Sequence, residues 1–265
     1  MLRFDGRVAL ITGSGRGLGA AYARYLAQRG AQVMVHDAGV AADGGGRDSR
    51  LADAVAQTIC QDGGQARACY DYLDGPDACQ RVIETTQRHF GRLDILIHNA
   101  GILSFTPIEE MPRDLFDRMC QVHISAPYWL AQAAWPHMMD QRYGRIVFTT
   151  SGRALCAERA QAGLSAYAMG KSAALGLMYT LALEGEPWGI RVNAIAPVAA
   201  TRMLQRTVDA DRFRPEDVAP GVAYLVSEPC DQSGIVLSAR DGRFATGTWS
   251  FGAAFNADEL ASRVN

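Results

Sequence analysis

The sequence predicts an α/β protein built as a single doubly wound, mostly parallel sheet with helices on both faces. Short β-branched runs alternate along the chain with longer segments of helical period. The runs are apolar almost throughout, as expected of parallel strands that are covered on both faces. No low-complexity linker or internal repeat divides the 265 residues. The repeated strand–helix pattern therefore favours one domain over residues 1–265, although the length alone would allow two.

Predicted strands and helices alternate from the first residues to about residue 238. The strand candidates are the runs 8–12, 31–36, 66–70, 93–98, 145–150, 191–196 and 234–238. Helical period is present near residues 17–29, 49–62, 76–89, 113–139, 165–184 and 215–228. A Gly-rich excursion at 38–49 is expected beside the second strand, and an irregular tail is expected over about 240–265.

Composition and charge exclude several classes of protein. Hydrophobic residues make up 48% of the chain, which is enough for a sizeable core and argues against disorder. The formal charge of −2 predicts no general attraction to nucleic acid or to an anionic membrane. The N-terminus leads straight into a strand, and no run is long enough to cross a bilayer. Six cysteines without metal-ligand spacing are expected to be reduced thiols in a cytoplasmic protein that has no metal site.

A glycine-rich turn follows the first strand and is expected to bind a dinucleotide. It reads T-G-S-G-R-G-L-G-A over residues 12–20. Glycines let the backbone approach a pyrophosphate, and the next helix N-terminus supplies N–H groups and the positive end of a dipole. One alignment uses Gly15 and Gly17, and another starts the turn at Gly13 because the strand ends at Thr12. Glycine clusters also form ordinary turns, but this position in a βα series favours a cofactor.

The second strand is followed by Asp37, 24 residues beyond Gly13. A carboxylate at this position can accept hydrogen bonds from the adenosine ribose and repel a 2′-phosphate. Arg16 acts in the opposite direction, because a guanidinium in the glycine turn could hold that phosphate. Asp37 is expected at the ribose itself, so the predicted cofactor is NAD rather than NADP.

Taken together, the motifs resemble those of the short-chain dehydrogenase/reductase family over residues 7 to about 237. They occur in the family's order: Thr12-Gly13-x-x-x-Gly17-x-Gly19, Asp37, Asn99-Ala100-Gly101, Ser151 and Tyr167-x-x-x-Lys171. Within the family, the chain is most similar to the (3R)-hydroxyacyl-CoA dehydrogenase domain of peroxisomal multifunctional enzyme type 2. The stretches that carry this closer similarity are LRFDGRVALITGSGRGLGAAYA, QVHISAPYWLAQAAWPHM, YGRIVFTTS and APVAATRM. The resemblance implies a Rossmann sheet and a homodimer or homotetramer.

The resemblance also implies which residues contact the dinucleotide. Asp71, at the end of the third strand, matches the position that contacts adenine, and the Asn-Ala-Gly turn closes over the cofactor in that family. The complete set expected at the cofactor is Gly13, Arg16, Gly17, Leu18, Gly19, Asp37, Asp71, Asn99, Ala100, Gly101, Tyr167, Lys171, Pro197 and Thr201.

Ser151, Tyr167 and Lys171 are the expected catalytic residues. Tyr167 and Lys171 are four residues apart on a predicted helix and therefore share one face. A free tyrosine has a pKa of about 10, too high for a base at neutral pH. The ammonium of Lys171 and the cationic nicotinamide are both expected to lower the pKa of Tyr167. Ser151 would hydrogen-bond the substrate oxygen as it becomes an alkoxide or carbonyl, and hydride transfer belongs to the cofactor.

The site departs from the family's usual pattern in three places, and a second serine lies near it. Ser151 precedes Tyr167 by sixteen residues, about three more than usual, which indicates an insertion. His123 replaces the family's catalytic asparagine and is expected in a proton relay, although a lone helical histidine is most often structural. His98 replaces the first asparagine of the usual Asn-Asn-Ala-Gly turn and is expected to serve packing only. Ser165 is expected to be a helix cap rather than a catalytic serine.

The substrate is the feature on which the sequence leaves most alternatives open. A lid over about 198–214 is expected to set specificity. Its residues 201–214 contain four arginines and two aspartates, a local charge of +2. Arg202 and Arg206 would share a helical face and could bind the phosphates of coenzyme A. A 3-hydroxyacyl-CoA is therefore one candidate, and a steroid, terpenoid or cyclic ketone is another. A non-catalytic dinucleotide sensor is the alternative of another class, which the intact Ser/Tyr/Lys set disfavours.

Overall fold

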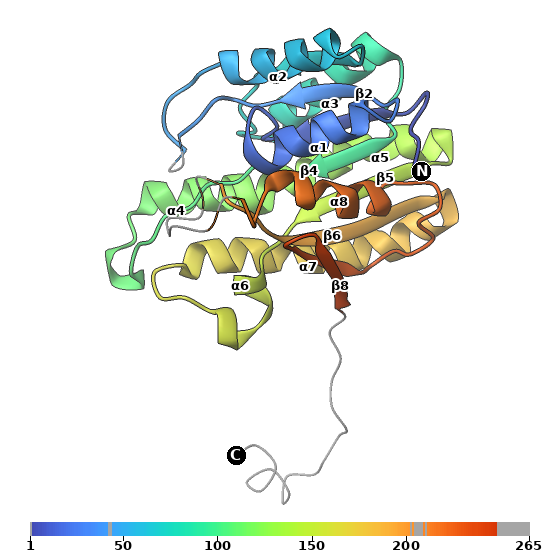
Figure 1. Ribbon diagram of the computed structural model, residues 1–265. Helices are drawn as coiled ribbons and strands as arrows, with labels where there is room; N and C mark the ends of the chain where they lie inside the picture. Colours follow the sequence, from blue (N-terminus) through green and yellow to red (C-terminus); the bar gives the residue numbers. More distant parts are fainter. Residues whose placement is uncertain (1, 42–43, 202, 204–208, 210, 248–265) are drawn as a thin grey trace, which may run out of the picture.

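The strands of the computed structural model, which describes residues 2–41, 44–201, 203, 209 and 211–247, form one sheet (Figure 1). Their spatial order is β3-β2-β1-β4-β5-β6-β7-β8. Strands β1 to β7 pair in parallel and β8 pairs antiparallel to β7, so the predicted doubly wound, mostly parallel sheet is confirmed. The bounds are β1 (Val8–Thr12), β2 (Gln32–His36), β3 (Gln65–Cys69), β4 (Ile95–His98), β5 (Gly144–Thr149), β6 (Ile190–Val198), β7 (Val236–Arg240) and β8 (Arg243–Gly247).

Helices cover both faces of this sheet, as predicted. One face packs against α1, α2 and α8, and the other packs against α3, α5 and α7. The α-helices are α1 (Gly17–Ala27), α2 (Arg50–Gln61), α3 (Pro76–Phe90), α4 (Arg113–Cys120), α5 (Ala126–Gln141), α6 (Gly152–Leu155), α7 (Ser165–Gly185) and α8 (Ala219–Leu225). Short 3₁₀ turns are η1 (Ile108–Glu110), η3 (Ala157–Arg159), η4 (Glu186–Trp188) and η5 (Pro215–Asp217).

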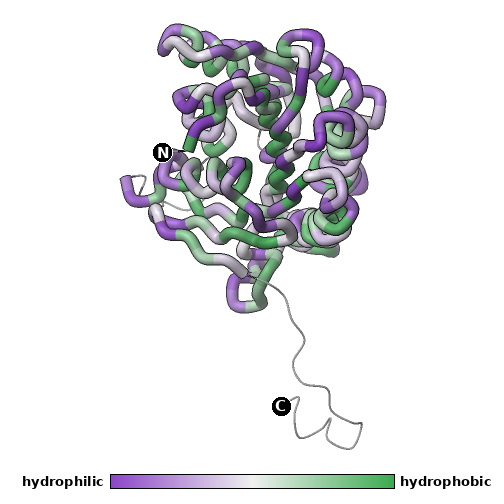
Figure 2. Tube along the Cα trace, turned by 90° about the vertical axis from the view of Figure 1, so that its right-hand side faces the viewer, coloured by the Kyte–Doolittle hydropathy of each residue, from purple (hydrophilic) through white to green (hydrophobic). Residues whose placement is uncertain are grey.

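Alternating side chains of the central strands supply two separate cores. Ile11 and Val35 pack against the helices of the first face, and Leu10 and Met34 pack against those of the second. All four side chains are fully buried. Figure 2 shows the same arrangement as hydrophobic strands inside a more hydrophilic outer layer of helices and loops. Two-sided burial explains why these strands read as continuous apolar runs in the sequence.

The helix predicted at 113–139 is interrupted at its centre. α4 runs into a π-helical turn, η2 (Gln121–Ser125), which continues directly into α5. The N–H group of Ala126 donates to the carbonyl of Gln121, five residues earlier. Pro127 follows and has no N–H group with which to continue the α-helical ladder. Single π-turns often mark functional sites, and this one contains His123.

The irregular tail predicted over about 240–265 is wrong for its first residues. Arg243–Gly247 form β8, which extends the sheet beyond β7. The two strands are joined by Asp241 and Gly242, whose φ angles are 54° and 66°. Two successive positive φ angles define the type I′ turn that Asp-Gly favours in hairpins. This dipeptide was the overlooked signal, and residues 248–265 lie outside the described residues.

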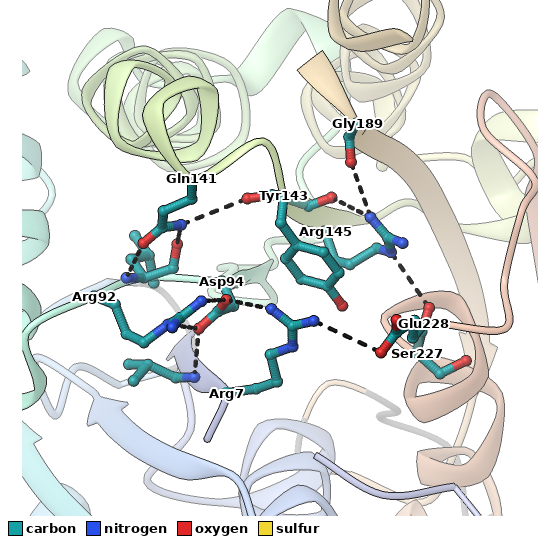
Figure 3. A network of polar contacts seen from close by, with 12 residues as sticks. Arg7, Arg92, Asp94, Gln141, Tyr143, Arg145, Gly189, Ser227 and Glu228 are labelled. Carbon is teal, nitrogen blue, oxygen red and sulfur yellow. Dashed lines mark hydrogen bonds and ion pairs between the residues drawn. The ribbon is translucent and has the colours of Figure 1, made fainter. Parts of the chain in front are cut away.

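A buried carboxylate holds the amino edge of the sheet together (Figure 3). Asp94 is fully buried just before β4 and accepts the N–H group of Val8 at 2.9 Å. The guanidinium of Arg92 binds both oxygens of Asp94, at 2.7 and 2.8 Å, and that of Arg7 binds one at 3.0 Å. Two arginines and a backbone donor thus compensate the desolvated charge and tie β1 to β4.

Arg145 extends the same network to β5 and α8. It is buried without a carboxylate partner among the described residues, and its guanidinium lies 4.3 Å from the centre of the Tyr143 ring. It donates to the carbonyls of Gly144, Gly189 and Ser227 at 2.8, 3.1 and 3.3 Å (Figure 3). These contacts fix the amino ends of the central strands, and the carboxyl ends carry the candidate site.

Candidate active site

The glycine turn and the Asn-Ala-Gly turn meet at the carboxyl ends of β1 and β4, where the strand order reverses. Sheets of this kind bind ligands at such a reversal. Gly13 has a φ of 64°, and a Cβ there would lie 2.8 Å from the Cα of Ala100. The side-chain amide of Asn99 donates to the carbonyls of Thr12 and Gly13 at 3.2 and 3.0 Å. The two turns therefore form one surface, as the predicted cofactor site requires.

The amino end of α1 is open at this surface. Helix α1 begins at Gly17, and the side chain of Arg16, its N-cap residue, does not cap it. A Cβ at Gly19 would lie 2.7 Å from the amide nitrogen of Asn99, so only glycine lets the helix approach the turn this closely. Thr201 lies against Gly17, and Leu18 is half-buried against the first core. The backbone here fits the pyrophosphate of a dinucleotide.

Asp37 and Arg16 both connect the glycine turn to the excursion at 38–49. The carboxylate of Asp37, 7% exposed, accepts the N–H groups of Gly15 and Gly39 at 2.9 and 2.8 Å. Each oxygen keeps a further lone pair for a ribose hydroxyl. The guanidinium of Arg16 donates to the carbonyl of Val40. Arg16 is thus directed toward the excursion, and neither residue by itself decides between NAD and NADP.

The remaining predicted cofactor residues lie along the same edge of the sheet. Asp71 follows β3, and its carbonyl accepts a hydrogen bond from His36 at 2.9 Å while its carboxylate pairs with Arg81 at 3.3 Å. Pro197 is the penultimate residue of β6. A Cβ at Gly101 would lie 3.7 Å from the amine of Lys171, so the turn after β4 borders this lysine.

Ser151, Tyr167 and Lys171 are brought together at the carboxyl end of β5. Ser151 is the N-cap of α6, and its Oγ accepts the N–H group of Arg153 at 3.2 Å. Tyr167 and Lys171 share one face of α7, with the Lys171 amine 5.8 Å from the centre of the Tyr167 ring. Lys171 is 4% exposed and donates to the carbonyl of Thr149 at 2.8 Å.

Burial controls the proton affinities of this trio. It raises the pKa of Tyr167, while a hydrogen bond with Ser151 and the positive charge of Arg153 act to lower it. Desolvation of the phenolate outweighs these two effects, and the lowering expected from Lys171 together with a bound cationic nicotinamide stays a prediction. Burial also lowers the pKa of Lys171 to about 7.

His123, the residue expected in a relay, belongs to the π-turn and packs against α7. Its ring packs edge-on against that of Tyr167, with centroids 5.5 Å apart. Its Nε2 lies 2.8 Å from the carbonyl oxygen of Ile102 and 3.3 Å from the backbone nitrogen of the same residue. The shorter contact is with the acceptor oxygen, which favours a proton on Nε2. Nδ1 is buried and has no hydrogen-bond partner among the described residues. Burial and the charge of Lys171 hold the pKa of His123 well below its ordinary value, so the ring is neutral with Nδ1 as an acceptor.

Arg153 was not among the residues predicted from the sequence. Its guanidinium lies 5.8 Å from the centre of the Phe105 ring, in the loop that follows β4. It forms no ion pair within the described part of the chain, and its charge reaches Tyr167. The sequence offered one signal for it: Arg153 lies two residues after Ser151, immediately before the loop 154–163 in which the insertion was expected.

Ser165 does not cap α7 as predicted. The helix begins at Ser165 itself, and Leu164 is the N-cap residue. Ser165 is exposed and borders an apolar groove of about 680 Å³, which Met111, Phe116 and Met169 also line. The side chain therefore lies on a different surface from that of Ser151.

The predicted lid is only partly described. Arg202 and Arg206, the pair expected to bind coenzyme A phosphates, lie outside the described residues. Arg212 pairs with Asp241 at 2.9 Å, and Arg214 pairs with Asp217 at 2.7 Å. These two arginines have carboxylate partners, which reduces the positive charge that the sequence suggested for the lid.

The chain is similar to dehydrogenases of known sequence and structure. A family model described as "short chain dehydrogenase" matches residues 7–212. Peroxisomal multifunctional enzyme type 2 of Mus musculus is 40% identical over 254 residues, which are 94% of this chain and 33% of that enzyme. A short chain dehydrogenase structure from Mycobacterium avium matches with a TM-score of 0.84 and 32% identity, covering 98% of this chain and 94% of the other.

Another similar solved structure contains a bound cofactor and a bound ligand. It is a 7α-hydroxysteroid dehydrogenase complexed with NADH and 7-oxoglycochenodeoxycholic acid. It matches with a TM-score of 0.79 and 30% identity, over 91% of this chain and 94% of that one. The chain spans 29% to 33% of the length of the peroxisomal enzymes that it matches in Neurospora crassa, Saccharomyces cerevisiae and Mus musculus. Among the described helices, none combines the length and the apolar character that crossing a membrane requires.

The two serines near Tyr167 should respond differently to substitution. Ser151→Ala removes the hydroxyl beside Tyr167, and we expect kcat to fall ~10²-fold, as for loss of one oxyanion donor. Ser165→Ala changes an exposed side chain in a different groove and should leave kcat within about twofold of the wild type. Steady-state turnover of both variants, with melting temperatures as the check on folding, makes the comparison. A larger loss in Ser165→Ala would mean that the catalytic serine has been misassigned.

Lys171 should titrate near neutral pH. It is the only lysine in the chain, so lysine labelled with ¹³C gives one side-chain resonance whose midpoint reports its pKa, expected at about 7. Between that value and the ordinary 10.5, the unfolded chain binds more protons than the folded protein, so folding stability rises with pH over this window. Lys171→Met should therefore exceed the wild type in melting temperature by most at about pH 6 and by least at about pH 10. An NMR midpoint near the ordinary lysine value would refute this.

Proposed function

This chain belongs to the short-chain dehydrogenase family, and we propose that it is an NAD-dependent oxidoreductase that interconverts a secondary alcohol and a ketone. The observation that carries the proposal is the meeting of Ser151, Tyr167 and Lys171 beside the glycine turn. A protein that only sensed the dinucleotide would need the turn but not the three catalytic side chains. We therefore favour the enzyme over a non-catalytic sensor, in a single domain that covers residues 1–265.

The residues that would hold the dinucleotide form a cradle that stays open because its glycines have no side chains. Any Cβ at Gly13 or Gly19 would meet the backbone of Ala100 or the amide of Asn99 within 3 Å. Asp37 keeps lone pairs that could accept the ribose hydroxyls, which supports NAD as the cofactor. When bound, the nicotinamide accepts the hydride in the oxidation direction and donates it in the reduction direction.

The chain's own residues would bind the substrate oxygen and move its proton. Ser151 Oγ accepts the N–H group of Arg153, and its own hydrogen, which is directed to Tyr167, would turn to the substrate oxygen when a substrate binds. Tyr167 would remove the hydroxyl proton as the base in oxidation and return it in reduction. Lys171 keeps N–H groups beyond the one bound to Thr149, and these would bind the nicotinamide ribose and stabilise the tyrosinate.

His123 would continue the proton path from Lys171. A Cβ at Gly101 would lie 3.7 Å from the amine of Lys171 and 3.8 Å from Nδ1 of His123. The two nitrogens therefore flank one small space that glycine leaves open. Nδ1 is the acceptor nitrogen, so it could receive a hydrogen bond from the lysine side through a water at this place.

Arg153 favours a substrate with a polar group near the reacting carbon. The guanidinium of Arg153, whose charge reaches Tyr167 and which has no carboxylate partner in the described chain, matches the thioester oxygen of a 3-hydroxyacyl-CoA better than a purely apolar ring. The similarity to peroxisomal multifunctional enzyme type 2 points the same way. A steroid, terpenoid or cyclic ketone is the second candidate, favoured by the steroid ligand of the 7α-hydroxysteroid dehydrogenase structure.

Assembly and location complete the proposal. Tyr128 on α5 and Tyr179 and Leu183 on α7 are large exposed hydrophobic side chains, which supports a homodimer or homotetramer. All six cysteines are free, and three of them are buried, which supports a reducing compartment. We propose the cytoplasm on that ground, while the relatives described above carry peroxisomal names.

Tyr167→Phe tests the reaction itself. The substitution keeps the ring against His123 but removes the proton carrier, so kcat should fall ~10²-fold or more while dinucleotide affinity stays unchanged. Absorbance of the reduced cofactor, followed with a panel of alcohols and ketones, measures turnover, and calorimetry measures the affinity. Near-normal turnover by this variant would disprove the proposed role of Tyr167. Dinucleotide binding without turnover of any panel member by the wild type would favour the sensor.

Asp37→Ala tests the cofactor. Removing the carboxylate removes its repulsion of a 2′-phosphate, so the ratio of kcat/KM for NAD to that for NADP should fall ~10-fold or more. Because Asp37 also holds Gly15 and Gly39, Asp37→Asn serves as the matched control that removes the charge with little change of shape. A wild type that prefers NADP would show that Arg16 outweighs Asp37.

Arg153→Met tests the substrate class. On a 3-hydroxyacyl-CoA, the variant should lose ~10-fold in kcat/KM, because a charge-assisted hydrogen bond is lost near the reacting carbon. A truncated thioester without the nucleotide should lose as much, whereas a cyclic ketone should lose little. Arg88→Met, an exposed arginine on α3, is the control. Equal losses on all three substrates would remove the argument for a thioester.

A further inference from the structure

His98 makes two hydrogen bonds whose directions the surrounding groups determine. The hydroxyl oxygen of Thr12 lies 3.1 Å from the N–H groups of both Asn99 and Ala100, which can only donate. The same oxygen lies 3.1 Å from Nδ1 of His98. These two N–H groups use both acceptor lone pairs of the hydroxyl, so its one hydrogen is what remains for the contact with His98. Nδ1 is therefore the acceptor and Nε2 carries the proton.

Nε2 of His98 points at a carbonyl in the π-turn. It lies 3.1 Å from the carbonyl oxygen of Val122. The helix cannot satisfy this oxygen in the usual way: Ala126, four residues on, donates to Gln121, and Pro127, five residues on, has no N–H group. A buried carbonyl left without a donor costs free energy, and the protonated Nε2 of His98 supplies that donor.

The π-turn in turn places His123. His123 follows Val122 directly, and its ring is enclosed by close contacts. A Cβ at Gly170 of α7 would lie 2.5 Å from the Cβ of His123, and one at Gly101 would lie 3.0 Å from its Cε1. Only glycine at these two positions lets His123 lie this close to α7 and to the turn after β4. The position of the Val122 carbonyl thus determines how His123 lies toward Lys171 and Tyr167.

We propose that His98 is a positioning residue of the catalytic site: by donating from Nε2 to the carbonyl of Val122, it holds the π-turn that aligns His123 beside Lys171. The kinetic part of this inference rests on the proposed function, while the structural part does not. Burial holds the pKa of His98 at about 3, so the neutral ring with a protonated Nε2 persists throughout the working pH range. The role goes beyond the packing expected from the sequence.

The kinetic experiment compares three variants at a temperature where all are folded. His98→Leu removes the donor, and kcat should fall ~10-fold or more, as misplacement of a catalytic group does. His98→Gln carries an amide N–H at the distance of Nε2 and should stay within about threefold of the wild type. Leu96→Ala, on the same strand face and fully buried, should lower the melting temperature but leave kcat unchanged. Equal kcat values for His98→Leu and His98→Gln would overturn the proposal.

A spectroscopic experiment separates this inference from the reaction. In ¹⁵N spectra of the wild-type histidines, His98 should show a protonated Nε2 and an unprotonated Nδ1. The opposite tautomer would exclude the bond to Val122 and overturn the proposal, even if no His98 variant folds. The resonance of the single lysine should move in His98→Leu and return toward its wild-type position in His98→Gln, while Leu96→Ala leaves it in place. These spectra decide the positioning role even if no alcohol is turned over.

Discussion

The hydroxyl of Thr12 is the contact on which the geometry of the site depends. It lies at the end of β1, accepts the N–H groups of Asn99 and Ala100 after β4, and donates to His98. These bonds hold the glycine turn against the Asn-Ala-Gly turn, and the missing Cβ of Gly13 lets the two backbones touch. Through His98, the same hydroxyl is linked to the π-turn and so to His123. One strand pairing thus positions both the cofactor surface and the proposed relay.

A buried charged group lies at each edge of the sheet, and only the one at the amino edge has partners of opposite charge. At the amino edge, the buried carboxylate of Asp94 is compensated by Arg7 and Arg92, an arrangement that serves stability (Figure 3). At the carboxyl edge, the buried amine of Lys171 donates to the carbonyl of Thr149 and has no carboxylate partner among the described residues. Desolvation without compensation destabilises the ammonium and brings its pKa to about 7. The same burial that costs stability makes this amine able to exchange protons near neutral pH.

Much of this arrangement could be predicted from the sequence. Seven of the strands, the parallel sheet and the faces of the main helices follow from apolar periodicity, because a strand buried on both sides needs a continuous apolar run. The glycine turn, Asp37 and the Tyr167–Lys171 pair could be located because their spacing on a strand end or a helix face is a local property. The chain's membership of the short-chain dehydrogenase family follows from the same local motifs. Strand β8 was missed although its Asp-Gly turn was visible in the sequence.

Only the tertiary structure determines the properties that depend on neighbours distant in sequence. The desolvation that raises the pKa of Tyr167 could not be read from the sequence, because spacing reveals the nearby lysine but not the loss of water around the phenol. Arg153 and His98 acquire roles only through Phe105, Thr12 and Val122, which lie in other elements. In the π-turn, likewise, the carbonyl of Val122 receives its hydrogen bond from His98 of β4. Periodicity and motif spacing are encoded along the chain, whereas desolvation and hydrogen-bond direction exist only after the chain has packed.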